Sequence, residues 1–363
     1  ISGYMFESAL QAGFISAGMD VTLLGPMPTP GVSFLANSNN QVGLVISASH
    51  NLFEDNGIKF FNKDGQKFSS ELEKRIETKL TQEMIAVESI NLGKASRMSD
   101  AQGRYIEFCK STFTNLDLKG LSVLLDCANG ATYSVAPKVF SELGATVNTI
   151  GSSPDGININ QNCGSTSPEN LKEEILKGSY DIGIAFDGDG DRILIVSSDG
   201  EILDGDDILY ILSKKIEDDS GVVGTLMTNK SLELHFKENG INFERADVGD
   251  KYVLQRLIDK SWQLGGEPSG HIICLDSAPT GDAIIAALKI LDAIKADNFS
   301  LNQSLEGFQK FPQTLINLKV DNPDKIIVSD KFWQRVTEIE LELGEDGRVL
   351  IRPSGTEPLI RIM

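Results

Sequence analysis

Short apolar runs alternate with longer amphipathic stretches along the whole chain. Such an alternation of strand-like and helix-like segments predicts an α/β architecture. The runs that we expect to form strands are 41–48, 121–130, 180–186 and 192–198, together with both flanks of a strand–loop–strand segment at 347–363.

The amphipathic stretches with the clearest helical signals are 131–144, 165–178 and 280–294. The first closes at Gly144, which suits a left-handed C-terminal cap. The second begins with Ser167 as its predicted N-cap and Pro168 at its first helical position. The third carries apolar side chains at helical spacing.

Three predicted strands each lead into a loop with reactive side chains, at 41–51, 181–192 and 262–271. This arrangement predicts one βα-type unit that is used three times. Polar or Gly/Pro-containing segments interrupt the pattern near residues 115, 207 and 312. We therefore expect four domains, at 1–115, 116–207, 208–312 and 313–363.

The charge balance narrows the classes of partner. The chain has 33 Lys and Arg against 52 Asp and Glu, a formal net charge of −19. Such an acidic chain is not expected to bind nucleic acid or an anionic membrane. A small anionic substrate stays compatible, provided that cations gather at its site.

The cysteines and the apolar runs indicate in which kind of cellular compartment the chain works. The four cysteines form no C-x-x-C pair, which argues against a zinc site and a disulfide scaffold and favours a reducing compartment. No apolar run approaches the roughly 20 residues that span a bilayer.

The stretch AFDGDGDRILIV, residues 185–196, concentrates negative charge between two apolar runs. Asp187, Asp189 and Asp191 can converge on one point, because Gly188 and Gly190 permit positive φ. Three carboxylates with few other donors suit a hard, oxygen-preferring cation, above all Mg²⁺. Such a cation would keep coordination positions open for substrate or phosphate oxygens.

Two other interpretations of this loop are weaker. An EF-hand calcium loop shares the D-x-D-x-D start, but Arg192 stands where it needs Gly and Ser198 where it needs Glu. A solvated acidic turn would stack three carboxylates without a counter-ion. The metal site is therefore the preferred hypothesis.

The stretch ISASHNLFEDNGIKFF, residues 46–61, offers Ser49, His50 and Lys59. A serine beside a histidine suggests a hydrolase, but neighbours in sequence seldom reach hydrogen-bond geometry, and no G-x-S-x-G elbow is present. A serine that carries a phosphoryl group would instead need a cation, positive side chains and a proton-transfer partner.

Two further loops carry groups that bind ligands. RPSGTEPLIR, 352–361, combines hydroxyls, a glycine and arginines into an anion-binding turn, with the candidates Arg352, Ser354, Gly355, Thr356 and Arg361. GGEPSGHI, 265–272, supplies Glu267, Ser269 and His271, which suit a polyhydroxylated ligand, although a plain Gly-rich turn is the alternative.

Together and in this order, SASHN, DGDGDR, GEPSGH and RPSGTEP resemble the α-D-phosphohexomutase superfamily. The resemblance covers essentially the whole chain. The stretches GPMPTPGVSFLA, ASHNLFEDNGIKFF, NINQNCGSTSPENL and VGDKYV are most similar to the branch that acts on glucosamine phosphates.

The resemblance implies a heart-shaped, multidomain α/β enzyme with three related α/β domains and a C-terminal phosphate-binding domain. The family pattern starts about 50 residues before this chain begins, so we expect the first and last domains to be incomplete.

The resemblance also implies an isomerase that acts as an intramolecular phosphotransferase. Ser49, phosphorylated at rest, would pass its phosphoryl group to glucosamine 6-phosphate and form a 1,6-bisphosphate. The other phosphate would return to Ser49 and release glucosamine 1-phosphate, on the route to UDP-N-acetylglucosamine and peptidoglycan.

Residue roles follow from the matched motifs. Asp187, Asp189, Asp191 and an oxygen on Ser49 would hold one Mg²⁺ per chain, with Arg192 beside the metal. The expected catalytic residues are Ser49, His50, Lys59 (in proton transfer) and Arg192. Substrate contacts are expected from Gly249, Asp250, Lys251, Glu267, Ser269 and His271. The non-transferring phosphate would be bound by Arg352, Ser354, Gly355, Thr356 and Arg361.

The implied partners and setting are equally specific. The substrate is a small phosphosugar, and glucose or glucosamine 1,6-bisphosphate serves as activator or intermediate. We expect a cytoplasmic monomer or homodimer that binds neither nucleic acid nor membrane.

Two alternatives stay open at this point. Phosphomannomutases and phosphoglucomutases share all four loops, and recognition of sugar C2 distinguishes them from the branch that acts on glucosamine phosphates. A catalytically silent phosphate- or metal-binding protein is the alternative outside the enzymes.

Overall fold

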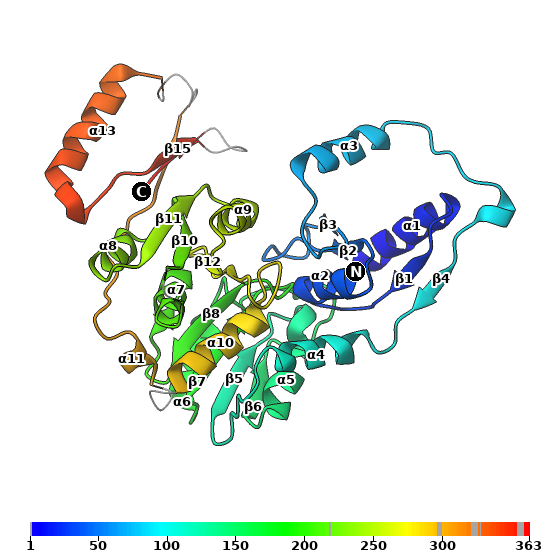
Figure 1. Cartoon of the computed structure of the whole chain (residues 1–363), viewed down its shortest axis with the longest axis horizontal. Helices are drawn as coiled ribbons and strands as arrows, with labels where there is room; N and C mark the ends of the chain where they lie inside the picture. Colours follow the sequence, from blue (N-terminus) through cyan, green and yellow to red (C-terminus); the bar gives the residue numbers. More distant parts are fainter. Residues whose placement is uncertain (1, 218, 296–299, 321–325, 327, 354–358) are drawn as a thin grey trace.

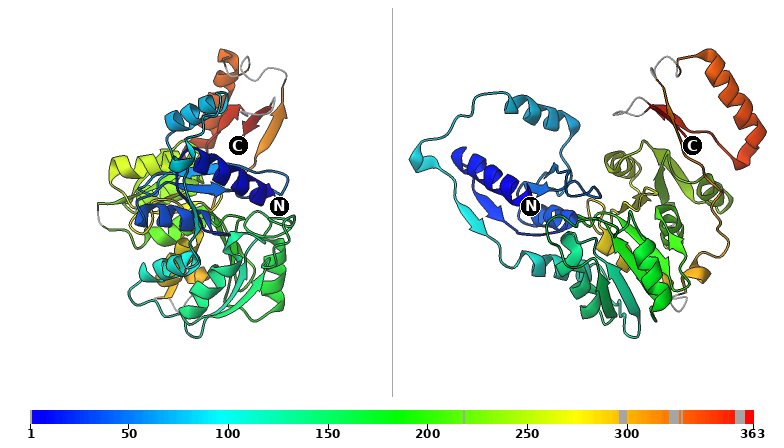
Figure 2. Two further views of the ribbon diagram at one scale, coloured as in Figure 1. Left: turned by 90° about the vertical axis from the view of Figure 1, so that its right-hand side faces the viewer. Right: turned by 180° about the vertical axis from the view of Figure 1, so that it is seen from behind.

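The computed structural model of the chain describes residues 2–217, 219–295, 300–320, 326, 328–353 and 359–363. The chain forms a series of separate sheets, with its N-terminal part on one side, its C-terminal part on the other and a larger sheet between them (Figures 1 and 2). Among the described helices, none is both long and apolar enough to cross a membrane.

The N-terminal part contains two small sheets. Strand β1 pairs in parallel with β4, and β2 pairs antiparallel with β3. Ser69 begins α3 by accepting a hydrogen bond from the Leu72 amide, and α2 follows Pro28. The elements are α1 (Ser2–Ser16), β1 (Val21–Leu23), α2 (Thr29–Ser38), β2 (Gly43–Ile46), β3 (Ile58–Phe61), α3 (Ser70–Leu80), η1 (Ser89–Asn91), β4 (Ala95–Arg97) and α4 (Ala101–Ser111).

The central sheet has the strand order β6-β5-β7-β8-β9. Its first three strands are parallel, while β8 and β9 run antiparallel to their neighbours. Every residue of β7 is buried, because helices cover both faces of the sheet. The elements are β5 (Ser122–Asp126), η2 (Ala131–Ser134), α5 (Ala136–Glu142), β6 (Thr146–Ile150), α6 (Glu169–Lys177), β7 (Ile182–Phe186), β8 (Ile193–Ser197) and β9 (Ile202–Leu203).

The third sheet has the order β11-β10-β12-β13, with only β13 antiparallel. Helices α7 and α10 are almost wholly buried, and α10 packs against both β13 and β8 of the central sheet. The elements are α7 (Gly205–Ser213), β10 (Gly221–Thr225), α8 (Lys230–Glu238), β11 (Asn242–Ala246), α9 (Asp250–Lys260), β12 (Leu264–Gly266), β13 (Ile272–Cys274) and α10 (Ala283–Lys295).

The C-terminal part is an antiparallel sheet in the order β14-β16-β15. The predicted strand–loop–strand segment is confirmed by the pairing of Ile351 with Ile362. The elements are α11 (Leu301–Ser304), β14 (Ile316–Lys319), α13 (Asp330–Leu343), η3 (Gly344–Asp346), β15 (Ile351–Pro353) and β16 (Leu359–Ile362).

The structure corrects three local predictions. The stretch predicted as a helix at 131–144 is a 3₁₀ turn followed by α5, and Pro137, which lacks an N–H, lies in the first turn of α5. Gly144 has the expected positive φ of 103°. Pro168, and not Ser167, occupies the N-cap of α6, and the Ser167 hydroxyl instead donates to Glu169.

The third correction concerns the repeated unit. Each of the three reactive loops joins two antiparallel strands, β2 to β3, β7 to β8 and β12 to β13, and none is a βα connection. Loops this short permit antiparallel pairing, whereas parallel neighbours need a crossover of a dozen or more residues. The common unit is therefore a hairpin with a reactive tip.

A buried acidic group lies where α7 begins. Asp204 and Asp207 form a reciprocal capping box. Both carboxylates also form ion pairs with Lys310. Between them, Asp206 is 1% exposed and accepts only the Asn229 amide, at 2.8 Å, within the described chain. Burial, followed by the nearby Asp204, raises the pKa of Asp206 to about 7.

We predict that Asp206→Asn removes part of the pH dependence of stability. The folded chain holds the Asp206 proton up to about pH 7, while the unfolded chain releases it near pH 4. The contribution of Asp206 to the free energy of unfolding therefore falls as the pH rises from 4 to 7, by up to about 4 kcal/mol at roughly 1.4 kcal/mol per pKa unit. The free energy of unfolding of Asp206→Asn relative to the wild type, obtained from urea titrations, should therefore increase between pH 4 and pH 8.

The exposed Asp292 provides a control, since Asp292→Asn should leave the wild-type slope unchanged. A wild-type slope in Asp206→Asn would contradict the prediction.

Candidate active site

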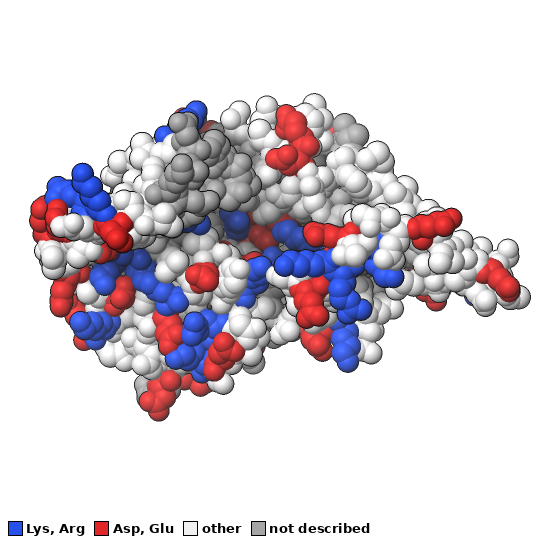
Figure 3. All heavy atoms as spheres, turned by 90° about the horizontal axis from the view of Figure 1, so that it is seen from above, with Lys and Arg blue, Asp and Glu red and all other residues white. Residues whose placement is uncertain are grey.

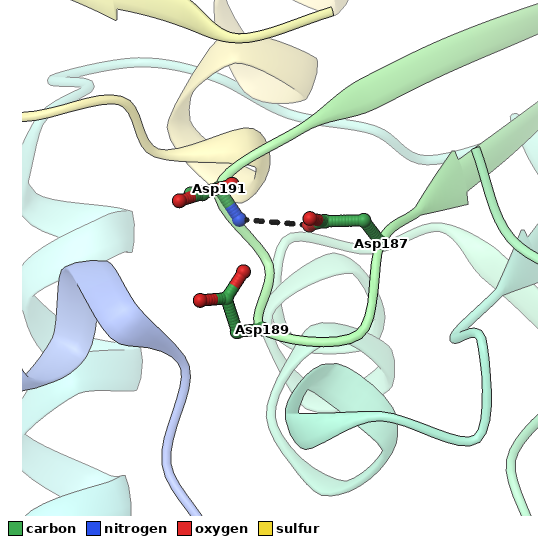
Figure 4. A group of neighbouring side chains, drawn as sticks. All are labelled: Asp187, Asp189 and Asp191. Atoms are coloured by element: carbon green, nitrogen blue, oxygen red, sulfur yellow. Dashed lines mark hydrogen bonds between the residues drawn. The ribbon is translucent and has the colours of Figure 1, made fainter. Parts of the chain in front are cut away.

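The aspartate loop leaves the buried strand β7 and enters β8. One carboxylate oxygen of Asp187 accepts the backbone amides of Gly190, Asp191 and Arg192 at 3.0–3.1 Å, which curls the loop around that side chain. Figure 4 shows the three aspartate side chains projecting from this single loop, and one of these hydrogen bonds. All three are at least 96% buried.

The two glycines of the loop serve different purposes. Gly190 has a φ of 75° and uses the predicted conformational freedom. Gly188 has no positive φ; a Cβ atom there would lie 2.6 Å from the Ser49 carbonyl oxygen. Its lack of a side chain is what allows the serine loop to approach.

The donor set of this loop fits a metal ion. One carboxylate oxygen from each of Asp187, Asp189 and Asp191 lies within 4.8 Å of the other two. One oxygen of Asp189 and one of Asp191 are buried without a hydrogen-bond partner among the described residues. Such oxygens are costly to bury unless a cation satisfies them, so the loop could hold a hard divalent cation.

The pKa values of two of the three carboxylates, Asp187 and Asp191, are shifted in opposite directions. Burial, and after it the charges of Asp191 and Asp189, raises the pKa of Asp187 well above its usual range. Burial works in the same direction on Asp191, but Lys59 and His271 outweigh it and hold the pKa of Asp191 well below its usual range. The carboxylates therefore differ in how firmly their charge is held.

The serine loop, between β2 and β3, lies against the aspartate loop. The Ser49 hydroxyl donates to Asp187 at 2.7 Å, and the His50 Nδ1 atom is 3.4 Å from the same hydroxyl oxygen. Ser49 has a φ of 56°, a conformation that is uncommon for a residue with a side chain. Burial and Arg192 lower the pKa of His50, so its imidazole is neutral at pH 7.

Asn160 holds the serine loop in place from the central part of the chain. Its amide nitrogen donates to the Ser49 carbonyl at 2.9 Å and to the Asn51 carbonyl at 2.8 Å. An open cavity of about 710 Å³ adjoins this contact and is lined by residues that include His50, Asn160 and Thr166. The strained serine is thus fixed by a residue more than 100 positions away.

Lys59, on β3, neutralises the aspartate loop. Its ammonium is 2.5 Å from Asp189 and 3.2 Å from Asp191. Burial alone lowers the pKa of Lys59, but the carboxylates of Asp191 and Asp189 outweigh it, and the net pKa is raised. Lys59 is therefore protonated in this arrangement.

The loop between β12 and β13, called the sugar loop after the ligand predicted from the sequence, meets the same cluster from the third sheet. His271 Nδ1 is 3.6 Å from Asp191, and its Nε2 is 3.7 Å from Asp250. A Glu267 oxygen accepts the Gly249 amide at 3.2 Å. The two segments predicted to contact substrate therefore adjoin each other and the aspartate loop.

The remaining predicted substrate residues lie at the edge of this cluster. Lys251 donates to Ser70 on α3 at 3.1 Å, and Ser269 is exposed. Seen from above, Lys, Arg, Asp and Glu side chains gather in a hollow between the N-terminal and C-terminal parts (Figure 3).

Comparison with known families accounts for almost the whole chain. It matches the families described as "Phosphoglucomutase/phosphomannomutase, alpha/beta/alpha domain I" at 1–86, domain II at 103–200, domain III at 204–311 and the C-terminal domain at 315–363. The chain belongs to the phosphoglucomutase/phosphomannomutase family. The resemblance and the multidomain α/β fold class drawn from the sequence are thereby confirmed.

Relatives within this family are similar over the full chain. A "Phosphoglucosamine mutase" of Legionella pneumophila is 53% identical over 369 residues, which cover 100% of this chain and 81% of the relative. A protein of the same name from Aeromonas hydrophila is also 53% identical, and 83% of it is covered.

Solved structures support the same fold. A phosphoglucomutase/phosphomannomutase family protein from Burkholderia thailandensis has a TM-score of 0.82 at 22% identity, covering 100% of this chain and 82% of the other. The N-acetylphosphoglucosamine mutase of Aspergillus fumigatus, in complex with GlcNAc-6P and magnesium, has a TM-score of 0.71 at 16% identity, covering 99% and 95%.

The loop that we expect to bind phosphate in this family member is described only in part. Arg352 on β15 and Arg361 on β16 are direct cross-strand partners, while Ser354, Gly355 and Thr356 lie outside the described residues. Opposite positions on antiparallel strands place both arginines on one face of the sheet. Two cations on one face suit an anionic ligand.

Sequence reasoning missed three residues of the site. The Thr29 hydroxyl donates to Asp189 at 2.6 Å, and the Thr29 amide donates to the Asp189 carbonyl at 2.8 Å. Lys67 forms an ion pair with Asp250. Asn160 lies in NINQNCGSTSPENL, and Thr29 lies in GPMPTPGVSFLA; both stretches resemble the family. Neither stretch, however, indicates which distant residue Asn160 or Thr29 contacts.

We predict that Asn160→Ala loosens the serine loop. Leaving two carbonyls without this donor costs about 1–3 kcal/mol. Amide hydrogen exchange of residues 47–52 should therefore accelerate by on the order of tenfold, as measured by mass spectrometry.

Asn162→Ala is a closely matched control. Asn162 belongs to the same loop and also has a positive φ, of 53°, but its side chain is exposed. Equal acceleration in both variants would mean that backbone strain, and not the Asn160 contacts, controls the serine loop.

Proposed function

We propose that this chain interconverts glucosamine 6-phosphate and glucosamine 1-phosphate through a phosphoserine at Ser49 and a 1,6-bisphosphate intermediate. The observation that carries the proposal is the 2.7 Å contact between the Ser49 hydroxyl and Asp187, within a buried cluster of three aspartates and Lys59. The relatives at 53% identity, both named phosphoglucosamine mutase, support the choice of sugar.

The reaction needs two transfers of one phosphoryl group each. In the first, the sugar 1-hydroxyl attacks the phosphorus on Ser49, the bond to the serine oxygen breaks, that oxygen ends with the proton that the sugar hydroxyl loses, and the 1,6-bisphosphate forms. In the second, the Ser49 oxygen attacks the phosphorus at C6, and glucosamine 1-phosphate leaves. Phosphoryl transfer depends mainly on positioning and charge neutralisation, which this site offers.

We assign proton transfer to two side chains of opposite character. His50, neutral and 3.4 Å from the Ser49 hydroxyl, can accept the serine proton in the second transfer. Lys59, held in its protonated form, can donate a proton to a sugar oxygen and neutralise phosphoryl charge. Arg192 would stabilise charge beside the same loop.

We propose one Mg²⁺ per chain, held by Asp187, Asp189, Asp191 and an oxygen on Ser49. When bound, it would neutralise the charge of the phosphoryl oxygens. The similar structure of the Aspergillus fumigatus enzyme contains magnesium. A second structure from this fungus is a complex with glucose 1,6-bisphosphate, which supports a bisphosphate as activator or intermediate.

We assign substrate binding to the sugar loop and the C-terminal sheet. Gly249, Asp250, Lys251, Glu267, Ser269 and His271 would contact the sugar. Arg352 and Arg361, together with Ser354, Gly355 and Thr356, would hold the phosphate that does not react. We further propose a cytoplasmic setting, which agrees with four free, buried cysteines.

We predict that the chain, supplied with Mg²⁺ and a trace of glucose 1,6-bisphosphate, isomerises glucosamine 6-phosphate faster than mannose 6-phosphate or glucose 6-phosphate. Ser49→Ala should lower this turnover at least about a thousandfold, because the covalent carrier is lost. Transfer of ³²P from labelled bisphosphate to the protein should disappear with it.

Ser111→Ala, an exposed hydroxyl change at the end of α4, should leave both measurements unchanged. A preference for mannose or glucose would move the chain to a sister activity with the same site. Full turnover by Ser49→Ala would contradict the phosphoserine mechanism.

We predict that Asp189→Asn weakens binding of a divalent cation at least about tenfold, because one charged oxygen ligand is removed. Mn²⁺ titration followed by electron paramagnetic resonance measures this directly. The exposed Asp199→Asn, at the far end of β8, should bind Mn²⁺ like the wild type. Chelation with EDTA should abolish turnover, and added Mg²⁺ should restore it.

A further inference from the structure

A tyrosine and an aspartate meet in the core where three parts of the chain join. The Tyr105 hydroxyl, on α4, donates to an Asp282 carboxylate oxygen at 2.8 Å. Tyr105 is fully buried and Asp282 is 97% buried. Neither was a candidate site residue in the sequence, yet a buried carboxylate retained at a junction calls for a physical reason.

The second oxygen of Asp282 caps helix α10. It accepts the backbone amides of Ile284 and Ile285, both at 3.0 Å. Ala283 follows Asp282 directly, and its amide donates instead to the Gly190 carbonyl at 3.1 Å. The start of α10 is thereby tied to the aspartate loop.

The hydrogen bonds continue into the aspartate cluster itself. The Gly190 amide donates to Asp187 at 3.0 Å, and the other Asp187 oxygen accepts the Ser49 hydroxyl at 2.7 Å. On its other side, Gly190 is closely packed, since a Cβ there would lie 2.6 Å from the Thr132 methyl carbon. Hydrogen bonds, connected by short backbone segments at the start of α10 and at Gly190, therefore link α4 to Ser49.

We propose that Tyr105 and Asp282 are positioning residues that hold the aspartate loop in its metal-binding conformation. The three carboxylates repel one another, so a contact that fixes the loop backbone from outside stabilises the arrangement in which they converge. The Ala283 amide of α10 binds the loop at the Gly190 carbonyl. Tyr105 fixes the Asp282 carboxylate, which in turn orients the first turn of α10 and therefore this amide. This inference rests on the proposed metal-dependent function.

The test measures metal affinity of the full chain, which a merely structural pair would not alter. Mn²⁺ is titrated into wild type, Tyr105→Phe, Asp282→Ala and Asp282→Asn, after each variant has been shown to be folded by circular dichroism. Partners beyond the first ligand shell commonly change metal affinity by about 10–100-fold. We expect a rise in Kd on the order of tenfold for Asp282→Ala and about threefold or more for Tyr105→Phe.

Asp282→Asn separates hydrogen bonding from charge. Its amide oxygen can still cap α10, and its amide nitrogen can donate to the Tyr105 hydroxyl oxygen. We expect its Kd for Mn²⁺ to stay within about twofold of the wild type. Tyr180→Phe is the control for removing a tyrosine hydroxyl, because Tyr180 packs against the separate apolar cluster that includes Leu171 and Ile175.

The outcomes are distinct. Raised Kd values in Tyr105→Phe and Asp282→Ala, with Asp282→Asn near wild type, support the positioning role. Wild-type Kd values in Tyr105→Phe and Asp282→Ala would overturn it, while wild-type isomerisation and its loss in Ser49→Ala would leave the proposed function standing. Should Asp282→Ala not fold, Tyr105→Phe, which loses one oxygen atom, decides alone. A wild-type chain that binds no Mn²⁺ would overturn the proposed metal site and this inference together.

Discussion

The mutual repulsion of three buried carboxylates is the constraint on which this structure depends. Asp187, Asp189 and Asp191 lie within one loop, shielded from water, where like charges interact strongly. Amides of the loop itself compensate part of this charge. The rest of the compensation comes from elsewhere in the sequence, as an ammonium and a hydroxyl from the N-terminal part and an imidazole from the third sheet. The site is consequently complete only when these parts are packed together.

The loops that carry Ser49, the three aspartates and His271 have the same local structure. The serine, aspartate and sugar loops each form the tip of an antiparallel hairpin whose strands are partly or wholly buried. The strands fix the ends of each loop, while hydrogen bonds between loops fix the tips. Ser49, the three aspartates and His271 therefore lie at hairpin tips, while Lys59 reaches them from strand β3. The surrounding structure stabilises strained residues such as Ser49.

The sequence was most informative where a signal is local. Apolar runs predicted β2, β5, β7 and β8, and helix α10, because burial alone specifies them. The alternation of Asp and Gly predicted that three aspartates converge in one loop, which the structure confirms, while binding of a metal there stays a prediction. Pro137 and Pro168 changed the helix starts, because a missing N–H and a preference for the first turn compete with simpler capping rules.

Long-range partners could not be predicted in the same way. Thr29 reaches a residue 160 positions away, and Lys67 one 183 positions away, and neither pattern nor spacing encodes such a contact. The positions of the domain boundaries at 115, 207 and 312, and the roles of the individual site residues, remain predictions.

Gly188 has a consequence for how this sequence can change. Its backbone fits between the Ser49 carbonyl on one side and Gly130 on the other, where a Cβ would come within 2.3 Å of the Gly188 oxygen. Any side chain at either glycine must push a neighbouring segment aside. A side chain at Gly130 would displace the aspartate loop, whereas one at Gly188 would displace both the serine loop and the segment that contains Ile159 and Asn160. Substitutions at these glycines are therefore expected to persist in evolution only together with changes in the segments that they displace.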